Sequence, residues 1–216
     1  MPEIVLLGSV HQENGRCNSS ELARILELFQ PDVLFEEIPY QKFLEKNDSF
    51  HRDILEVKAL YEYLKHHSVL HIPVDTVDPS SFKQSKFDEV VDRVLHAGPD
   101  LRSMLNEQTS LTYNSGFEYL NSRLNDRMFQ RIDVTIATAL EKMNDERLSM
   151  GYSEWKAYNS KRETAMVTKV YEFCRLNHFE KGVFLFGSAH RAGLIAKIQT
   201  VKRTQKVRVS WKLDWG

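Results

Sequence analysis

The feature that most constrains the fold is a short pattern that occurs twice, once near each end of the 216-residue chain. Residues 5–11 read Val-Leu-Leu-Gly-Ser-Val-His, and residues 184–190 read Phe-Leu-Phe-Gly-Ser-Ala-His. A short apolar run is typical of a buried strand, and a glycine permits the sharp exit turn that bulkier residues resist. The pattern therefore predicts two buried strands that each deliver a histidine, His11 or His190, just beyond the carboxyl end.

Further apolar runs alternate with helical segments in the first third of the chain. Residues 4–7 and 33–35 read as strands, and the helix between them has Asn18 as its predicted N-cap with Glu21 three positions later. Residues 69–74 form a third run, after a helix predicted over about residues 50–67. Short buried runs separated by helices are typical of parallel sheets. We therefore expect an α/β fold with a mostly parallel sheet flanked by helices.

The middle of the chain has helical periodicity only. Apolar residues recur at i+4 at positions 120, 124, 128, 132, 136 and 140. A strand over residues 182–186, a helix over about 190–198 and an alternating run over 207–213 follow, and the alternation predicts an edge strand. We expect a single α/β domain over residues 1–216, with a large helical insertion over approximately residues 81–177 before the last strands.

Charge and composition exclude several classes of protein. The chain has 29 Lys and Arg against 30 Asp and Glu, a formal charge of -1 that gives no overall attraction to nucleic acid or to an anionic membrane. No apolar run reaches the roughly 18 residues that span a bilayer. Cys17 and Cys174 lack the spacing of a zinc or redox motif, so reduced thiols are expected. We expect a soluble, cytoplasmic protein without a nucleic-acid partner, and the oligomeric state stays open.

The predicted strand ends carry side chains that can support chemistry. Ligands of open parallel sheets bind beyond the carboxyl ends of the strands, where the sequence places His11, His190, Asp75 and the pair Glu36 and Glu37. Two imidazoles with one or two carboxylates suit a divalent transition metal with an open coordination position. Because successive strand side chains point in opposite directions, one of the two glutamates should face the pocket and the other should be solvated or salt-bridged. Asp75 has an alternative role as a helix cap or turn residue.

An arginine interrupts an apolar stripe on a helix predicted to start near residue 153. Tyr158, Arg162, Met166 and Val170 follow one another at i+4. A buried guanidinium needs partners, so either Arg162 pairs with a carboxylate at the sheet edge or its charge reaches water at the end of a buried stem. Pairing is the favoured interpretation. Glu163 is either a further pocket carboxylate or part of a solvated face, and its spacing alone favours the solvated face.

Taken in order, these motifs resemble the superfamily that joins TraB/PrgY pheromone-shutdown proteins, TIKI metalloproteases, ChaN-like haem-binding proteins and erythromycin esterases. The resemblance covers about residues 3–78 and 153–200. It matches the family's Glu to Glu37, whereas Thr76 stands in place of an arginine and Glu163 in place of an aspartate. The segments that carry it are Gly8-Ser9-Val10-His11, Pro31-Asp32 with the strand to Glu36-Glu37, Val74-Asp75, Arg162-Glu163 with Met166, and Gly187-Ser188-Ala189-His190 with Gly193.

This resemblance implies a cleft of His, Glu, Arg and His between an α/β core and a helical insertion. Members of the superfamily include divalent-metal peptidases, metal-free esterases with a histidine base, haem-binding proteins and regulatory proteins. The first hypothesis is therefore a hydrolase of a peptide or ester bond, acting on a small-molecule or peptide substrate. Its catalytic residues are His11, Glu37, Arg162 and His190, with Asp75, Glu36 and Glu163 as further binding residues.

The same hypothesis leaves the means of water activation open. His11, Glu37 and His190 are the expected ligands of a divalent metal such as Mn²⁺, Zn²⁺ or Co²⁺, or Glu37 and a histidine activate water directly. Arg162 would orient a carboxylate or stabilise the developing oxyanion. The alternatives are a ChaN-like protein that binds haem or iron in this pocket, and a noncatalytic regulator whose pocket is vestigial.

Overall fold

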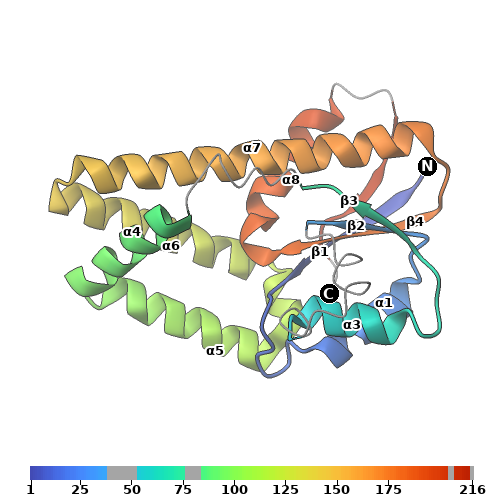
Figure 1. The fold of residues 1–216 in the computed structure, drawn as a ribbon, viewed down its shortest axis with the longest axis horizontal. Helices are drawn as coiled ribbons and strands as arrows, with labels where there is room; N and C mark the ends of the chain where they lie inside the picture. Colours follow the sequence, from blue (N-terminus) through green and yellow to red (C-terminus); the bar gives the residue numbers. More distant parts are fainter. Residues whose placement is uncertain (38–52, 76–83, 204–206, 215–216) are drawn as a thin grey trace.

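The computed structural model describes residues 1–37, 53–75, 84–203 and 207–214. Figure 1 shows an α/β core from which long helices extend to one side. Within the described residues, the core contains a five-stranded parallel sheet with strand order β3-β2-β4-β1-β5. The predicted α/β class and the parallel sheet are confirmed. The strands are β1 (Glu3–Ser9), β2 (Val33–Glu36), β3 (Leu70–Pro73), β4 (Lys181–Gly187) and β5 (Ser210–Lys212).

Helices cover both faces of the sheet. Helices α1 (Ser19–Phe29) and α3 (Leu55–Tyr63) pack on one face, and α7 (Glu146–Leu176) and α8 (Arg191–Lys202) pack on the other. Side chains of β2 alternate between the two cores, with Leu34 in the first and Phe35 in the second. Because both faces are apolar, the strands read as continuous apolar runs in the sequence.

The predicted elements are present with some different ends. Asn18 caps α1 as expected, since its Oδ1 accepts a hydrogen bond from Glu21 N at 3.0 Å. The helix predicted from about residue 50 is α3, which starts at Leu55, and residues 50–52 lie outside the described part of the chain. Helix α7 begins at Glu146, earlier than the predicted start near residue 153. The predicted edge strand is confirmed as β5, at an edge of the sheet, although it is shorter than residues 207–213.

The helical insertion has a core of its own. It consists of α4 (Gln84–Ala97), α5 (Asp100–Leu120), α6 (Arg123–Met143) and the first part of α7, which then continues onto the sheet (Figure 1). The apolar residues that recur at i+4 from Leu120 to Leu140 do not belong to one helix, because α5 ends at Leu120 and Ser122 caps α6. Leu124, in the first turn of α6, is 45% exposed rather than buried. No helix in the described ranges is both long and apolar enough to cross a membrane.

The two Gly-Ser-x-His segments lie side by side. Strands β1 and β4 pair in parallel, with Gly8 opposite Phe186 and Ser9 opposite Gly187, so the two motifs leave the same edge of the sheet one residue out of step. Asn121, at the end of α5, joins them to the insertion, because its side-chain amide accepts from Gly8 N at 2.6 Å and donates to Gly8 O at 3.0 Å. A Cβ atom on Gly8 would lie only 3.2 Å from Ser188. This close approach explains the glycine of the first motif.

Candidate functional site

Arg162 of α7 lies at the centre of a polar cluster beyond the carboxyl ends of β2 and β3. Its Nε and Nη2 donate to Asp75 Oδ2 at 3.1 and 2.7 Å, and Nη2 also donates to Glu37 Oε1 at 2.8 Å. The side chains of Arg162, Glu37 and Asp75 are 16%, 8% and 2% exposed. Burial lowers the pKa of Arg162, but the hydrogen bond to Asp75 raises it, and the net pKa is above the ordinary value. The predicted ion pair of Arg162 is confirmed, and Asp75 is a partner in it.

Glu37 connects this cluster to the second Gly-Ser-x-His segment. Its Oε2 accepts a hydrogen bond from Gly187 N at 2.6 Å, and its Oε1 lies 3.5 Å from His190 Nε2. Both carboxylate oxygens are therefore in contact with donors or with the histidine ring. Glu37, rather than Glu36, is the glutamate that faces Arg162, in agreement with the assignment made from the sequence.

His190 and Glu163 form a buried pair. His190 Nδ1 lies 3.0 Å from Glu163 Oε1, and the two side chains are each 12% exposed. A carboxylate oxygen accepts hydrogen bonds, so this contact favours the tautomer in which Nδ1 donates to Glu163 and Nε2 faces the cavity side of the ring. The interpretation of Glu163 as part of a solvated face is wrong. Gly193 of α8 allows this arrangement, because a Cβ atom there would overlap the Glu163 carboxylate.

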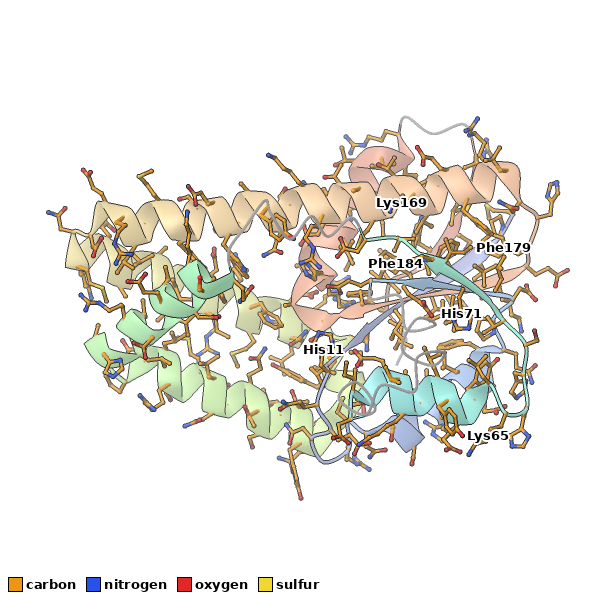
Figure 2. All side chains as sticks on the ribbon, in the orientation of Figure 1. His11, Lys65, His71, Lys169, Phe179 and Phe184 are labelled. Carbon is orange, nitrogen blue, oxygen red and sulfur yellow. The ribbon has the colours of Figure 1, made fainter. Side chains whose placement is uncertain are left out.

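His11 has a carboxylate partner of its own. Its Nδ1 lies 3.2 Å from Oε1 of Glu56, which is fully buried in the first turn of α3, whereas the His11 side chain is 52% exposed. The hydrogen bond to Glu56 raises the pKa of His11, while burial opposes the shift, and the Glu37 charge adds to it. Leu55 N donates to His11 O at 2.9 Å and fixes the backbone of this pair. Figure 2 shows His11 at the end of the sheet that faces the helical insertion.

Glu36 lies outside the Arg162 cluster. It is fully buried, and its Oε1 lies 2.6 Å from Nδ1 of His71 on the neighbouring strand β3. Figure 2 shows His71 within the α/β core. One of the two glutamates thus faces away from the pocket, as expected, and its partner is a histidine ring. A binding role for Glu36 is not supported, since Glu36 does not line the cavity described next.

A cavity of about 1400 Å³ lies between the α/β core and the helical insertion. Drug-sized ligands are usually bound in cavities of about 300–1000 Å³, so this volume is ample for a small organic molecule. The structure thus brings the two histidines of the repeated motif to one cavity. The polar side chains that line its inner end are His11, Glu37, Asp75, Arg162, Glu163 and His190.

The donor set fits an arginine better than a divalent metal ion. Nη2 of Arg162 lies between Glu37 and Asp75, where a cation shared by the two carboxylates would have to bind. Nδ1 of His11 and Nδ1 of His190 face carboxylates, so each histidine could bind a metal only through Nε2, as histidine ligands with a carboxylate partner commonly do. In the part of the chain that the structure describes, no three His, Cys, Asp or Glu side chains are grouped so as to hold a metal.

Sequence reasoning missed two partners of the cluster. Glu56 lies within a predicted helix and has no motif around it, and only its position in the first turn of a helix near the exit of β1 could have drawn attention to it. Asn159, one turn before Arg162, accepts from Nη1 at 3.1 Å. Its i, i+3 spacing from Arg162 was a usable signal.

The chain was compared with protein-family models, with curated protein sequences and with solved structures. None of the three comparisons finds a match. The site is therefore interpreted from its own geometry.

Proposed function

We propose that this protein is a hydrolase that uses His190, oriented by Glu163, as the general base for an attacking water. The observation that supports this most directly is the buried contact of 3.0 Å between His190 Nδ1 and Glu163 Oε1, which leaves Nε2 beside Glu37 and Arg162. A histidine held by a carboxylate at Nδ1 is the usual arrangement of an imidazole base. The bond broken is a carboxylic ester or an amide.

The reaction proceeds in two steps in this proposal. Water loses a proton to His190 Nε2 as its oxygen attacks the carbonyl carbon, and the carbonyl oxygen becomes negative. Arg162 Nη1 is the proposed donor to that oxygen, because Nε and Nη2 are directed at carboxylates. One hydrogen of Nη1 is directed at Asn159, and the second is available beside His190 Nε2, which lies 3.5 Å away. The intermediate then breaks its bond to the alcohol or amine, which leaves with a proton, and a carboxylic acid remains.

His11 is the group proposed to give the leaving group its proton. Its pairing with Glu56 raises its pKa, which favours the protonated ring that an acid requires, and its exposure gives the ring access to the cavity. The site would thus contain two histidine–carboxylate pairs, with His190 as base and His11 as acid. Glu37 lies 3.5 Å from the His190 ring, within the range of a water shared by the two side chains.

The experiment is a hydrolysis assay on the purified chain with nitrophenyl esters and fluorogenic peptides. We expect ester hydrolysis that falls about 100- to 10,000-fold in His190→Ala, since general base catalysis by a positioned side chain contributes that much. Glu163→Gln should reduce kcat more than it changes KM. His96→Ala is the matched control, because His96 is 74% exposed on α4 and should keep full activity. Hydrolysis that survives His190→Ala would overturn the assignment of the base.

Metal dependence is tested in the same assay. A metal bound by His11, Glu37 and His190 would supply a bound water of lowered pKa when present. Because Arg162 lies between the carboxylates, we expect activity to persist after chelation and to change little with Mn²⁺, Zn²⁺ or Co²⁺. Activity that disappears with chelation and returns with one of these ions would instead support the metal-dependent form of the hydrolase.

Haem binding is a second candidate, supported by the apolar side chains that line much of the cavity and by the two histidines at one end of it. Either Nε2 atom could serve as an axial ligand of the iron. Titration with haemin, followed by the Soret absorbance of the wild-type chain and of His11→Ala and His190→Ala, decides this candidate. A saturable spectrum that is lost in one variant would favour the haem-binding function over the hydrolase.

The order of the motifs and the cluster around Arg162 support membership of the TraB, TIKI, ChaN-like and erythromycin esterase superfamily as a proposal. Free thiols at Cys17 and Cys174 are compatible with the reducing environment of the cytoplasm, the location proposed for the protein.

A chain that neither hydrolyses the substrates nor binds haem would be best explained as a regulator that acts through protein contacts.

A further inference from the structure

The cavity that contains the polar cluster extends into the helical insertion. There its walls come from four helices and are mostly apolar, although polar side chains such as Gln108, Asp133 and Lys156 also line the cavity. The cavity therefore has a charged end at the sheet and a mostly apolar part in the insertion. We call this second part the apolar slot. The side chains that define it are Phe87 and Val91 of α4, Leu101 and Leu105 of α5, Ile136 of α6 and Trp155 of α7.

Helix α7 connects the two ends of the cavity. Trp155 precedes Arg162 by seven residues, which is two helical turns, so both side chains lie on the same face of the helix. The rise of 1.5 Å per residue separates them by about 10 Å along the axis. Both residues line the same cavity, so the polar cluster and the slot are about two helical turns apart along α7.

Two aromatic rings form part of the wall of the slot. Phe87 stacks on Trp155, with ring centroids 4.1 Å apart and an angle of 10° between the planes. Both residues are only half-buried, although they belong to the margin of a hydrophobic core. Partly exposed aromatic side chains that line a cavity of this size are typical of sites for apolar groups.

We propose that the apolar slot binds an apolar group of the substrate, attached to the ester or amide that the polar cluster hydrolyses. This inference rests on the proposed function and adds the substrate class, a hydrophobic ester or amide. A peptide in the slot would place many backbone N–H and C=O groups against apolar side chains such as Phe87, Leu105 and Trp155, which disfavours it. An aliphatic chain or an apolar ring meets no such cost and is stabilised by the area that it buries.

The first experiment measures binding, which does not depend on hydrolysis. Cis-parinaric acid, a fluorescent fatty acid, is added to the purified chain and then displaced with decanol or with adamantanemethanol. We expect the fluorescence to saturate as the probe is added. If the slot accepts both chains and rings, both alcohols should reduce this fluorescence. If the slot accepts only chains, decanol alone should reduce it. No saturable binding of the probe would overturn the proposal.

Substitutions in the wall of the slot test whether the probe binds there. Leu105→Trp fills the space between α5 and the aromatic wall and should weaken probe binding at least tenfold. Val91→Phe adds a smaller volume from α4 and serves where the larger ring disturbs folding, which circular dichroism reports. Val134→Trp is the matched control, because Val134 lies on the insertion helix α6 but is 57% exposed and does not line the cavity. Equal binding by folded slot variants and control would overturn the proposal.

The second experiment is a series of nitrophenyl esters from acetate to decanoate. If each added methylene is buried, kcat/KM should rise about fourfold per methylene until the chain fills the slot, and Leu105→Trp should flatten this rise. Hydrolysis without any dependence on chain length would refute the slot but leave the hydrolase intact. Probe binding without hydrolysis of any ester would refute the hydrolase but leave the slot intact.

Discussion

Removal of the Arg162 guanidinium is the perturbation whose effect the structure predicts in most detail. Arg162→Met keeps a long, unbranched side chain in helix α7 and deletes the positive charge. The variant leaves Glu37 and Asp75 as two carboxylates whose side chains are 8% and 2% exposed, without the donor that joins them. The methionine side chain has no hydrogen-bond donor, so it cannot pair with either carboxylate.

The magnitude follows from the burial of this ion pair. Breaking a buried pair by removal of one partner costs about 3–5 kcal/mol, since an uncompensated charge stays in the interior. For a chain of this size, each kcal/mol lowers the melting temperature by about 2–4 °C. We therefore expect Arg162→Met to melt about 6–20 °C below the wild-type protein. Its hydrolytic activity should also be lost, because Nη1 is the proposed oxyanion donor.

The assay is urea unfolding followed by circular dichroism, together with the double variant Arg162→Met, Asp75→Asn. The second substitution removes one of the two charges that the first leaves unpaired, so the double variant should be more stable than Arg162→Met alone. Arg147→Met is the control on the same helix. Arg147 pairs with Glu89 at the surface, and its side chain is 67% exposed, so little change is expected.

Two results would refute this reasoning. Arg162→Met with the wild-type free energy of unfolding would mean that the buried pair contributes nothing to stability. A double variant whose loss equals the sum of the two single losses would mean that Arg162 and Asp75 do not interact energetically, despite the distance of 2.7 Å between Nη2 and Oδ2.

Three further predictions concern the remaining parts of the site. The pKa of His11 is raised by its pairing with Glu56, so this pairing stabilises the fold fully below the unfolded-state pKa of about 6.5. The contribution is lost as the pH rises through the folded-state pKa. Glu56→Gln should therefore destabilise the protein more at pH 5.5 than at pH 8.5 in urea titrations. Gly193→Ala should displace Glu163 from the His190 ring and lower kcat at least tenfold while the chain stays folded, whereas unchanged kcat would show that the close approach is unimportant. Burial raises the pKa of Cys17 to about 12, so its thiol should react with iodoacetamide at pH 8 only after unfolding, and rapid labelling of the native protein would contradict this.

Local signals in the sequence were sufficient for the architecture. The apolar runs before Gly8 and Gly187 and the cap at Asn18 depend on neighbours a few residues away, and the structure confirms the strands and the helix that they predict. The isolated arginine in the stripe of α7 was also informative. An unpaired guanidinium is costly in an apolar environment, so the position of Arg162 favoured a carboxylate partner over a charge that reaches water.

Tertiary structure decided which partner each polar group has. Glu163 follows Arg162 directly and reads as solvated, but the return of the chain through β4 brings His190 to within 3.0 Å of it. His11 meets Glu56 because α3 packs beside the exit of β1. Contacts of this kind join residues separated by tens of positions, and Arg162 and Glu37 are 125 positions apart. Sequence periodicity reports the face of an element on which a side chain lies, whereas strand order and helix packing determine what that face meets.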